Sequence, residues 1–149
     1  MARDTKDDIY IDKMIQQIND AASDKGYNQA QKLNFVIAFI QNLPYTVDSV
    51  TTPYDEYPRY LIETLFNRGG DCEDASIVVA ALLDGMGYDV CLISLKGHMA
   101  VSVALAGVTG SYYEYGGEKY FYLETTGDGW QIGQVPSRIT ERTAKIYPL

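Results

Sequence analysis

Hydrophobic residues in the first third of the chain recur at helical spacing. Apolar positions separated by three and four residues lie on one face of a helix. One such set precedes Gly26, and another lies between about Asn28 and Leu43, where Pro44 stops the second helix. The first set is Ile11, Met14, Ile15, Ile18 and Ala22, and the second is Leu33, Val36, Ile37 and Ile40. The pattern predicts two amphipathic helices whose apolar faces enter a core.

A more hydrophobic helix is predicted after Asp71. This residue occupies an N-cap position, and Asp74 is placed to complete a capping box. Residues 75–83 are apolar on nearly every side, so we expect this helix to be buried. The chain before it is predicted to be an extended loop over 45–57 and a short helix over 58–66.

In the second half the spacing changes from helical to alternating, which predicts β-strands separated by glycine turns. Lys96–Gly97 and Gly116–Gly117 are the clearest turns, and the second is typical of a tight hairpin. The predicted strands cover 90–95, 99–106, 111–115, 119–125 and 132–135. Helices followed by an antiparallel sheet predict an α+β fold, and we expect residues 1–149 to form one domain.

The net charge of the chain restricts the classes of molecule that it can bind. The 149 residues include 12 basic and 20 acidic side chains, a formal charge of −8. Nucleic acids and anionic membranes require a basic face, so neither is expected as a partner. The N-terminal residues are polar, without the apolar core of a signal peptide, and no apolar run approaches the ~20 residues of a membrane span. We therefore expect a cytoplasmic protein or a soluble domain of a longer, anchored protein.

Thiol and imidazole chemistry has few candidates, because the chain holds 2 cysteines and 1 histidine. Cys72 follows Gly-Gly-Asp at the first turn of the buried helix, where free N–H groups and the helix dipole favour a thiolate. His98 follows a turn at the start of a strand, and Glu124 ends another. A nucleophile, a base and a carboxylate that orients the base are the groups that thiol acyl transfer requires. Cys91 lies within an apolar strand and is predicted to be a core residue.

Three motifs resemble those of the transglutaminase-like superfamily. Gly70–Ala75 (GDCEDA) is similar to its nucleophile motif, Gly97–Val101 (GHMAV) to its histidine motif, and Tyr122–Thr126 (YLETT) to its acid motif. The order of the three motifs is also that of the superfamily. Glu63–Leu65, ahead of the nucleophile, resembles the bacterial and archaeal protease-like branch. The resemblance covers about residues 33–136, the motif-bearing core of the predicted domain.

The resemblance implies a papain-like core, with N-terminal helices and a buried nucleophile helix packed on a C-terminal antiparallel sheet. It implies a cysteine protease or amidase that uses Cys72, His98 and Glu124 as a catalytic triad and forms a thioester. Water as the acceptor gives hydrolysis of a peptide or isopeptide bond, and an amine gives transamidation. No organic cofactor is implied. Glu124 departs from the aspartate that is commoner at this position, and its extra methylene changes the reach of the carboxylate.

The sequence also offers candidate residues for the oxyanion site and for the substrate cleft. The Cys72 backbone N–H is expected in the oxyanion site, and the candidates for the second donor are Gln41, Tyr45, Tyr54 and Tyr57, of which Tyr57 is favoured. Tyr54 and Trp130 are expected to line the substrate cleft. Acidic residues near the nucleophile suggest protein or peptide substrates that contain lysine. These residues are Asp55, Glu56, Asp71, Glu73 and Asp74.

Two other functions fit the same residues. Cys72, His98 and Glu124 are acceptable zinc ligands, although the chain lacks the paired ligand spacing typical of zinc sites. A non-catalytic peptide-binding module that retains the cleft is the alternative from another class, and the tyrosine-rich composition would suit it. A close approach of Cys72 to His98 favours the enzyme, whereas a wide separation favours the binding module.

Overall fold

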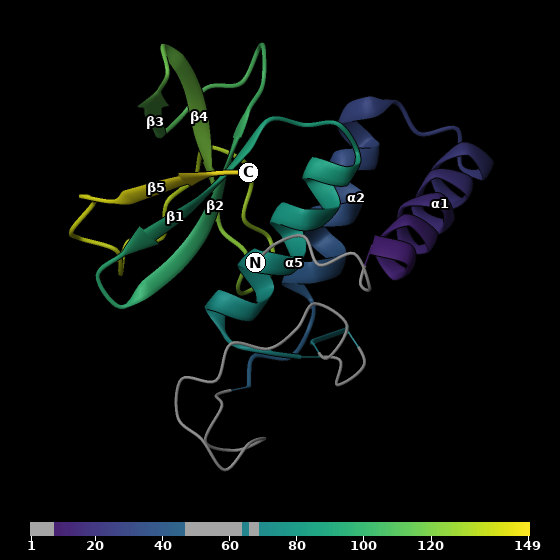
Figure 1. Ribbon diagram of the computed structural model, residues 1–149, viewed down its shortest axis with the longest axis horizontal. Helices are drawn as coiled ribbons and strands as arrows, with labels where there is room; N and C mark the ends of the chain where they lie inside the picture. The colour runs from purple at the N-terminus through teal and green to yellow at the C-terminus, as the bar shows by residue number, and fades with distance from the viewer. Residues whose placement is uncertain (1–7, 47–63, 66–68) are drawn as a thin grey trace.

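The computed structural model describes residues 8–46, 64–65 and 69–149. Within them, helices α1 (Asp8–Asp24), α2 (Gln29–Gln41) and α5 (Cys72–Gly85) pack against one antiparallel sheet with the strand order β3-β4-β2-β1-β5. The strands are β1 (Val90–Leu95), β2 (His98–Ala104), β3 (Tyr112–Tyr115), β4 (Glu118–Leu123) and β5 (Lys145–Pro148). The predicted α+β class is confirmed, with the helices on one side of the sheet (Figure 1).

Local signals set the ends of the helices. Asn28 caps α2, and it exchanges hydrogen bonds with Gln31 in a capping box. After α1, Gly26 takes a positive φ of 66°, and the N–H of Tyr27 donates to the carbonyl of Ala22 at 2.8 Å. The two predicted amphipathic helices are therefore confirmed, with ends close to those expected.

Helix α5 begins as the sequence predicts. The carboxylate of Asp71 accepts hydrogen bonds from the N–H groups of Glu73 (2.9 Å) and Asp74 (3.1 Å), and Asp74 in turn accepts from the N–H of Asp71 (3.4 Å). This reciprocal capping box satisfies amide groups that the first turn of a helix leaves unpaired. It also places Cys72 at the first helical position.

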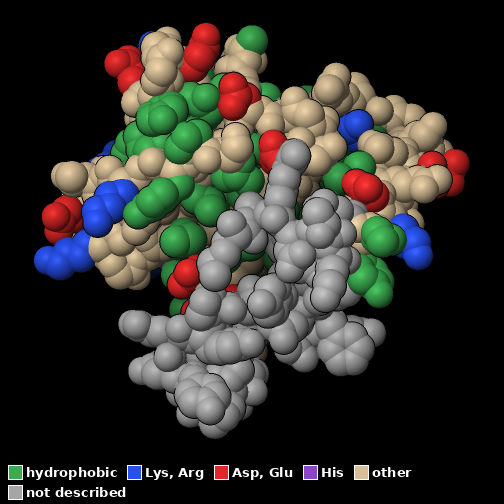
Figure 2. Space-filling model, viewed as in Figure 1, with side chains coloured by type: hydrophobic (Ala, Val, Ile, Leu, Met, Phe, Trp, Pro, Cys, Tyr) green, Lys and Arg blue, Asp and Glu red, His purple; other side chains and the backbone are tan. Residues whose placement is uncertain are grey.

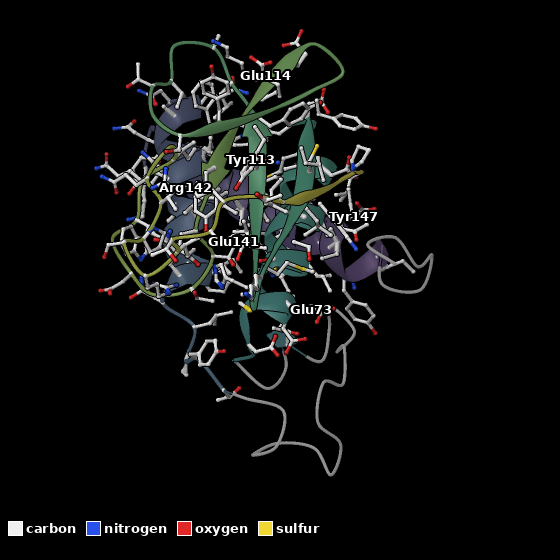
Figure 3. All side chains as sticks on the ribbon, turned by 90° about the vertical axis from the view of Figure 1, so that its left-hand side faces the viewer. Glu73, Tyr113, Glu114, Glu141, Arg142 and Tyr147 are labelled. Carbon is white, nitrogen blue, oxygen red and sulfur yellow. The ribbon has the colours of Figure 1, made fainter. Side chains whose placement is uncertain are left out.

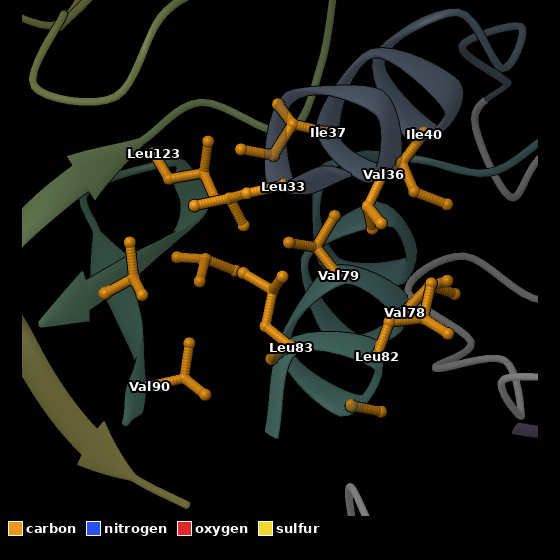
Figure 4. Packing of buried hydrophobic residues seen from close by; sticks show 14 of the residues in the cluster. Leu33, Val36, Ile37, Ile40, Val78, Val79, Leu82, Leu83, Val90 and Leu123 are labelled. Atoms are coloured by element: carbon orange, nitrogen blue, oxygen red, sulfur yellow. The ribbon is translucent and has the colours of Figure 1, made fainter. Parts of the chain in front are cut away.

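The main core lies between the helices and the sheet. Figure 4 shows the α2 side chains meeting those of α5, while Val90 and Leu123 approach from the sheet. The buried members include Leu33, Val36, Ile37, Ile40, Val78, Val79, Leu82, Leu83, Val90 and Leu123. Side chains of this size each contribute roughly 1.5–3 kcal/mol when fully buried, so this cluster holds α5 in place.

The opposite face of the sheet is buried as well. Alternate residues of β1 and β4 join a second cluster that contains Cys91, Ile93, Tyr120 and Tyr122. Side chains from the C-terminal part of the chain, including Val135, Ile139 and Ile146, pack against it. The sheet is therefore a central layer with a hydrophobic cluster on each face.

The tyrosine-rich strands show the same alternation. Tyr120 and Tyr122 are buried, whereas Tyr112, Tyr115 and Tyr147 are 42%, 43% and 49% exposed on the two edge strands. Figure 2 shows hydrophobic side chains gathered over this part of the sheet. Part of the tyrosine excess therefore has a structural role in the second cluster.

The strand predicted over 132–135 is wrong. The chain turns there instead, because Gly133 takes a φ of 88° while its N–H donates to the carbonyl of Tyr122 and its carbonyl accepts from the N–H of Ser111. The fifth strand is β5, which pairs antiparallel with β1. It ends at Pro148, which an edge strand tolerates because one side of the strand needs no ladder donors.

Two other predicted segments lie largely outside the described residues. Of the loop over 45–57, Tyr45 forms a parallel bridge to Gly70. Of the helix over 58–66, Thr64 and Leu65 are described, and both are helical. None of the described helices combines the length and the hydropathy that a membrane crossing requires.

Candidate active site

The sheet topology brings His98 and Glu124 together. His98 is the first residue of β2, and Glu124 directly follows β4. These strands are antiparallel neighbours, with Val101 opposite Leu123, so the start of β2 and the end of β4 lie at the same edge of the sheet. The beginning of α5, which carries Cys72, reaches this edge from the helical layer.

His98 and Glu124 form a close, buried pair. The Nε2 atom of His98 lies 3.2 Å from Oε1 and 3.1 Å from Oε2 of Glu124. The side chain of His98 is 12% exposed and that of Glu124 is 0% exposed. Water therefore screens the pair weakly, and the carboxylate holds the imidazole ring in one orientation.

The side chain of Cys72 lies close enough to the same imidazole to change its pKa. Burial by itself lowers the pKa of His98, but the interaction with the Cys72 side chain, the hydrogen bond that the ring donates to Glu124 and the charges of both groups outweigh burial and raise the pKa to about 9. Because Nε2 faces the carboxylate, Nδ1 is the nitrogen left for Cys72. The structure thus brings together the three residues that the sequence singled out.

Many donors surround the carboxylate of Glu124. Oε1 accepts hydrogen bonds from the N–H groups of Thr125 and Thr126, both at 3.1 Å, and from the hydroxyl of Thr126 at 2.8 Å. Oε2 accepts from the hydroxyl of Tyr122 at 3.0 Å and lies 3.5 Å from Nη2 of Arg138. Burial by itself raises the pKa of Glu124, but the hydrogen bond and charge of His98, followed by the bonds from Thr126, lower it to about 2.

Sequence analysis missed Tyr122, Thr126 and Arg138 as partners of the acid. A signal for the first was present, because residues two apart on a strand share a face and Tyr122 precedes Glu124 by two. The contact with Glu124 also raises the pKa of Tyr122, in addition to the larger effect of burial. The phenol therefore remains protonated and donates to the carboxylate throughout the ordinary pH range.

The two glycines before the nucleophile are required by packing. A β-carbon at Gly69 would lie 2.5 Å from the carbonyl oxygen of Pro44, and one at Gly70 would lie 2.6 Å from the β-carbon of Asp74. Both distances are shorter than side-chain carbons tolerate. The glycines thus allow the chain before Cys72 to pack closely against Pro44 and against the side chain of Asp74.

The candidate donors for the oxyanion site differ in their hydrogen bonds and in their exposure. Within the described part of the chain, no hydrogen bond is made to the N–H of Cys72, which lies in the first turn of α5. The side-chain nitrogen of Gln41, in contrast, donates to the backbone carbonyls of Glu124 (2.9 Å) and Trp130 (3.0 Å). Tyr45 is 58% exposed, and Tyr54 and Tyr57 lie outside the described residues.

Trp130 lies in a cavity of about 610 Å³ beside α2. Its wall also includes Leu33, Ile37, Leu105 and Ile132, but not Cys72, His98 or Glu124. Gln41 joins this cavity to the triad region, because it lines the cavity and binds the backbone of Glu124. The role of Trp130 in a substrate cleft stays a prediction.

The acidic residues near the nucleophile act mainly on the helix itself. Asp71 and Asp74 form the capping box, and Asp74 is only 2% exposed. Glu73 is partly exposed at the start of α5 (Figure 3). Asp55 and Glu56 lie outside the described residues, so the preference for lysine-containing substrates stays a prediction.

Cys91 lies in a more buried environment than Cys72. Its thiol is 0% exposed in the second cluster, and burial followed by the charge of Asp89 raises its pKa to about 11. Both cysteines are free. Over the described ranges, no group of three or more histidine, cysteine, aspartate and glutamate side chains is arranged to hold a metal ion.

The solved structures that are similar to this chain include three of one protein. Legionella pneumophila LapG matches with 17% identity and a TM-score of 0.47, covering 90% of this chain and 81% of that chain. The EGTA-treated form of LapG matches with 18% identity and a TM-score of 0.47, covering 90% of this chain and 78% of that chain. The calcium-bound form matches with 17% identity and a TM-score of 0.46, covering 90% of this chain and 81% of that chain. Neither protein-family models nor curated proteins give a match. The similarity is distant and concerns the path of the chain, so the chemistry rests on the geometry of the site.

Proposed function

We propose that this chain is a cysteine-dependent amide hydrolase of the transglutaminase-like type, acting on peptide or isopeptide bonds. The observation that carries the proposal is the position of His98, whose Nε2 lies 3.2 and 3.1 Å from the two oxygens of the buried Glu124 carboxylate and whose pKa is raised by the neighbouring Cys72 side chain. Thiol acyl transfer requires a thiol beside an imidazole base and a carboxylate that orients the imidazole. The three motifs that resemble the superfamily support the same assignment.

In the first half-reaction, the sulfur of Cys72 attacks the carbonyl carbon of the amide. The thiol proton passes to Nδ1 of His98. As the C–N bond breaks, His98 gives this proton to the departing amine, and the acyl group remains on Cys72 as a thioester. The N–H of Cys72 is placed to donate to the oxyanion, because the first turn of α5 leaves it without a helical partner.

In the second half-reaction, His98 accepts a proton from the incoming nucleophile. Water attacks the thioester, the C–S bond breaks, and the proton on His98 returns to the sulfur of Cys72. An amine in place of water completes a transamidation with the same proton transfers. Glu124 keeps the Nε2–H of His98 directed toward itself and stabilises the imidazolium in both halves.

Selective alkylation tests the nucleophile. We expect iodoacetamide at neutral pH to modify Cys72 much faster than Cys91, because Cys72 is partly exposed beside His98 and Cys91 is buried. Labelling is followed by peptide mass mapping of the native protein. Equal labelling rates of the two cysteines in folded protein would contradict the assignment.

Activity is tested with a pool of peptide and isopeptide substrates. Cys72→Ala is expected to abolish both product release and the thioester adduct seen by mass spectrometry, whereas the matched Cys91→Ala variant retains both. Added lysine-type amines distinguish the two acceptors, because transamidation adds the mass of the amine to the acyl product. Equal turnover by wild type and Cys72→Ala would exclude this mechanism.

A further inference from the structure

A groove adjoins the triad on the side of His98. It has a volume of about 440 Å³ and is lined by Lys96, Gly97, His98 and residues 138–141. The β1–β2 turn forms one wall, the segment before β5 forms the other, and His98 belongs to both the groove and the triad. The groove therefore begins at the imidazole ring of His98.

The wall formed by residues 138–141 is held on the sheet. Just beyond it, the hydroxyl of Tyr113 on β3 donates to the carbonyl of Arg142 at 3.1 Å, and Nη1 of Arg142 lies 3.4 Å from the hydroxyl of Ser111. Figure 3 shows Tyr113, Glu141 and Arg142 close together on this side of the molecule. Ile139 packs against the second cluster. These contacts preorganise the groove for binding.

Arg138 gives the groove a positive charge next to the triad. Its Nη2 lies 3.4 Å from the hydroxyl of Thr126 and 3.5 Å from Oε2 of Glu124. These contacts involve one nitrogen of a guanidinium that carries five N–H donors, and the side chain is 55% exposed. A ligand in the groove can reach the remaining donors, whose planar arrangement suits a carboxylate.

The second ion pair of the groove is weaker. Lys96 and Glu141 approach to 3.6 Å, with side chains 83% and 57% exposed. An ion pair this exposed contributes little to stability, so an incoming carboxylate can compete for Lys96. Of the side chains that line the groove, Lys96 and Arg138 are cationic and Glu141 is anionic, with His98 adding charge when protonated.

The mechanism assigns this groove to one side of the scissile bond. His98 donates its proton to the departing amine, so the amine half of the substrate must lie against His98. The groove begins at His98, and we propose that it binds this leaving-amine half and that Arg138 selects a carboxylate there. The carboxylate belongs either to an acidic side chain soon after the scissile bond or to a free C-terminus. This inference rests on the proposed function and adds a substrate class to it.

Binding is measured first, because it needs no turnover. The protein is the Cys72→Ala variant, and the probes are fluorescent tetrapeptides with a free N-terminus that mimic the released amine. Three probes differ only in their carboxylates: glutamate with an amidated C-terminus, glutamine with a free C-terminus, and glutamine with an amidated C-terminus. We expect either carboxylate to tighten binding roughly tenfold at low salt, the effect of one charge-assisted hydrogen bond, and the gain to decrease as salt rises.

Charge variants identify the side chain responsible. Adding Arg138→Gln to Cys72→Ala is expected to remove the gain, whereas Glu141→Gln is expected to increase it by removing a competing carboxylate. Equal binding of all three probes, or a gain that survives Arg138→Gln, would overturn the inference. If Arg138→Gln does not fold, the Glu141→Gln variant decides, because an unchanged gain there contradicts a carboxylate site in this groove.

Cleavage separates this inference from the proposed function. Wild-type protein is given peptide pools with glutamate, glutamine or lysine at the first two leaving-side positions, and kcat/KM is measured by mass spectrometry. A preference for glutamate supports both proposals. Cleavage without that preference contradicts only the carboxylate site. Probe binding without cleavage of any peptide contradicts only the proposed hydrolase.

Discussion

At the scale of single residues, Glu124 is the unusual member of the site. The superfamily that the motifs resemble more often has aspartate at this position. The donors around this carboxylate explain how the longer side chain is held, since Oε1 is bound by the backbone and hydroxyl of Thr126 and Oε2 by the hydroxyl of Tyr122. A carboxylate with these bonds remains ionised and keeps a fixed position beside His98.

The pair of His98 and Glu124 predicts how stability depends on pH. The pKa of Glu124 is lowered from 4.5 to about 2, so its contribution is present above pH 4.5 and is lost as the pH falls toward 2. The pKa of His98 is raised from 6.5 to about 9, so its contribution is present below pH 6.5 and is lost as the pH rises through 9. The difference in unfolding free energy between wild type and Glu124→Gln should therefore be largest between pH 4.5 and 6.5.

Urea unfolding of both proteins across pH 3–10 measures this difference. A difference that does not vary with pH would show that the two groups do not interact. The same variant is expected to lower kcat/KM by roughly 10³- to 10⁴-fold, because the imidazole loses its orienting group. Without the carboxylate the pKa of His98 falls, so the alkaline decline of any residual activity should move to lower pH.

At the scale of elements, the start of α5 combines two tasks. The capping box of Asp71 and Asp74 completes the first turn, and the next residue after the cap is Cys72, the proposed nucleophile. The first turn is also where backbone N–H groups lack helical partners, so the position that requires a cap also carries the proposed oxyanion donor, the N–H of Cys72. The capping box could be predicted from the sequence because capping depends on residues within three positions of each other.

The two capping boxes of the chain offer a matched test. Asp71→Ala and Asn28→Ala each remove an N-cap, of α5 and α2 respectively, and each is expected to cost about 0.5–2 kcal/mol of stability. Asp71→Ala should also lower kcat/KM, because the first turn that positions Cys72 loosens. Chemical denaturation and peptide kinetics measure the two effects. Equal kcat/KM values for the two variants would show that the cap of α5 does not contribute to catalysis.

At the scale of the whole molecule, helices and sheet are joined at the site by Gln41. This residue of α2 is 5% exposed, and its side-chain nitrogen donates to the carbonyls of Glu124 and Trp130. It therefore connects the helical layer to the segment that follows β4. The carbonyls it binds belong to residues more than eighty positions away in the chain, as the separations of 83 and 89 show.

Removal of this link should weaken both stability and catalysis. Gln41→Leu keeps much of the side-chain volume but leaves buried carbonyl groups without their donor, at a cost of about 1–3 kcal/mol. We expect a lower melting temperature and a moderate loss of kcat/KM, since Glu124 loses a support on its backbone. Asn42→Leu is the exposed control, because the side-chain nitrogen of Asn42 donates to the nearby carbonyl of Ala38 in the last turn of α2. A Gln41→Leu variant as stable as this control would contradict the role of the link.

The sequence by itself determined the features that depend on neighbours along the chain. Helix ends follow from Asn28 and Asp71, the β1–β2 turn follows from Lys96–Gly97, and the scarcity of cysteine and histidine left few candidates for the thiol and its base. Only the tertiary structure decided which donors surround Glu124, that β5 rather than residues 132–135 completes the sheet, and that Arg138 borders a groove beside His98. The physical reason is that capping and turn formation are local, whereas hydrogen bonds to a buried carboxylate and the choice of an edge strand depend on segments brought together by burial of the core.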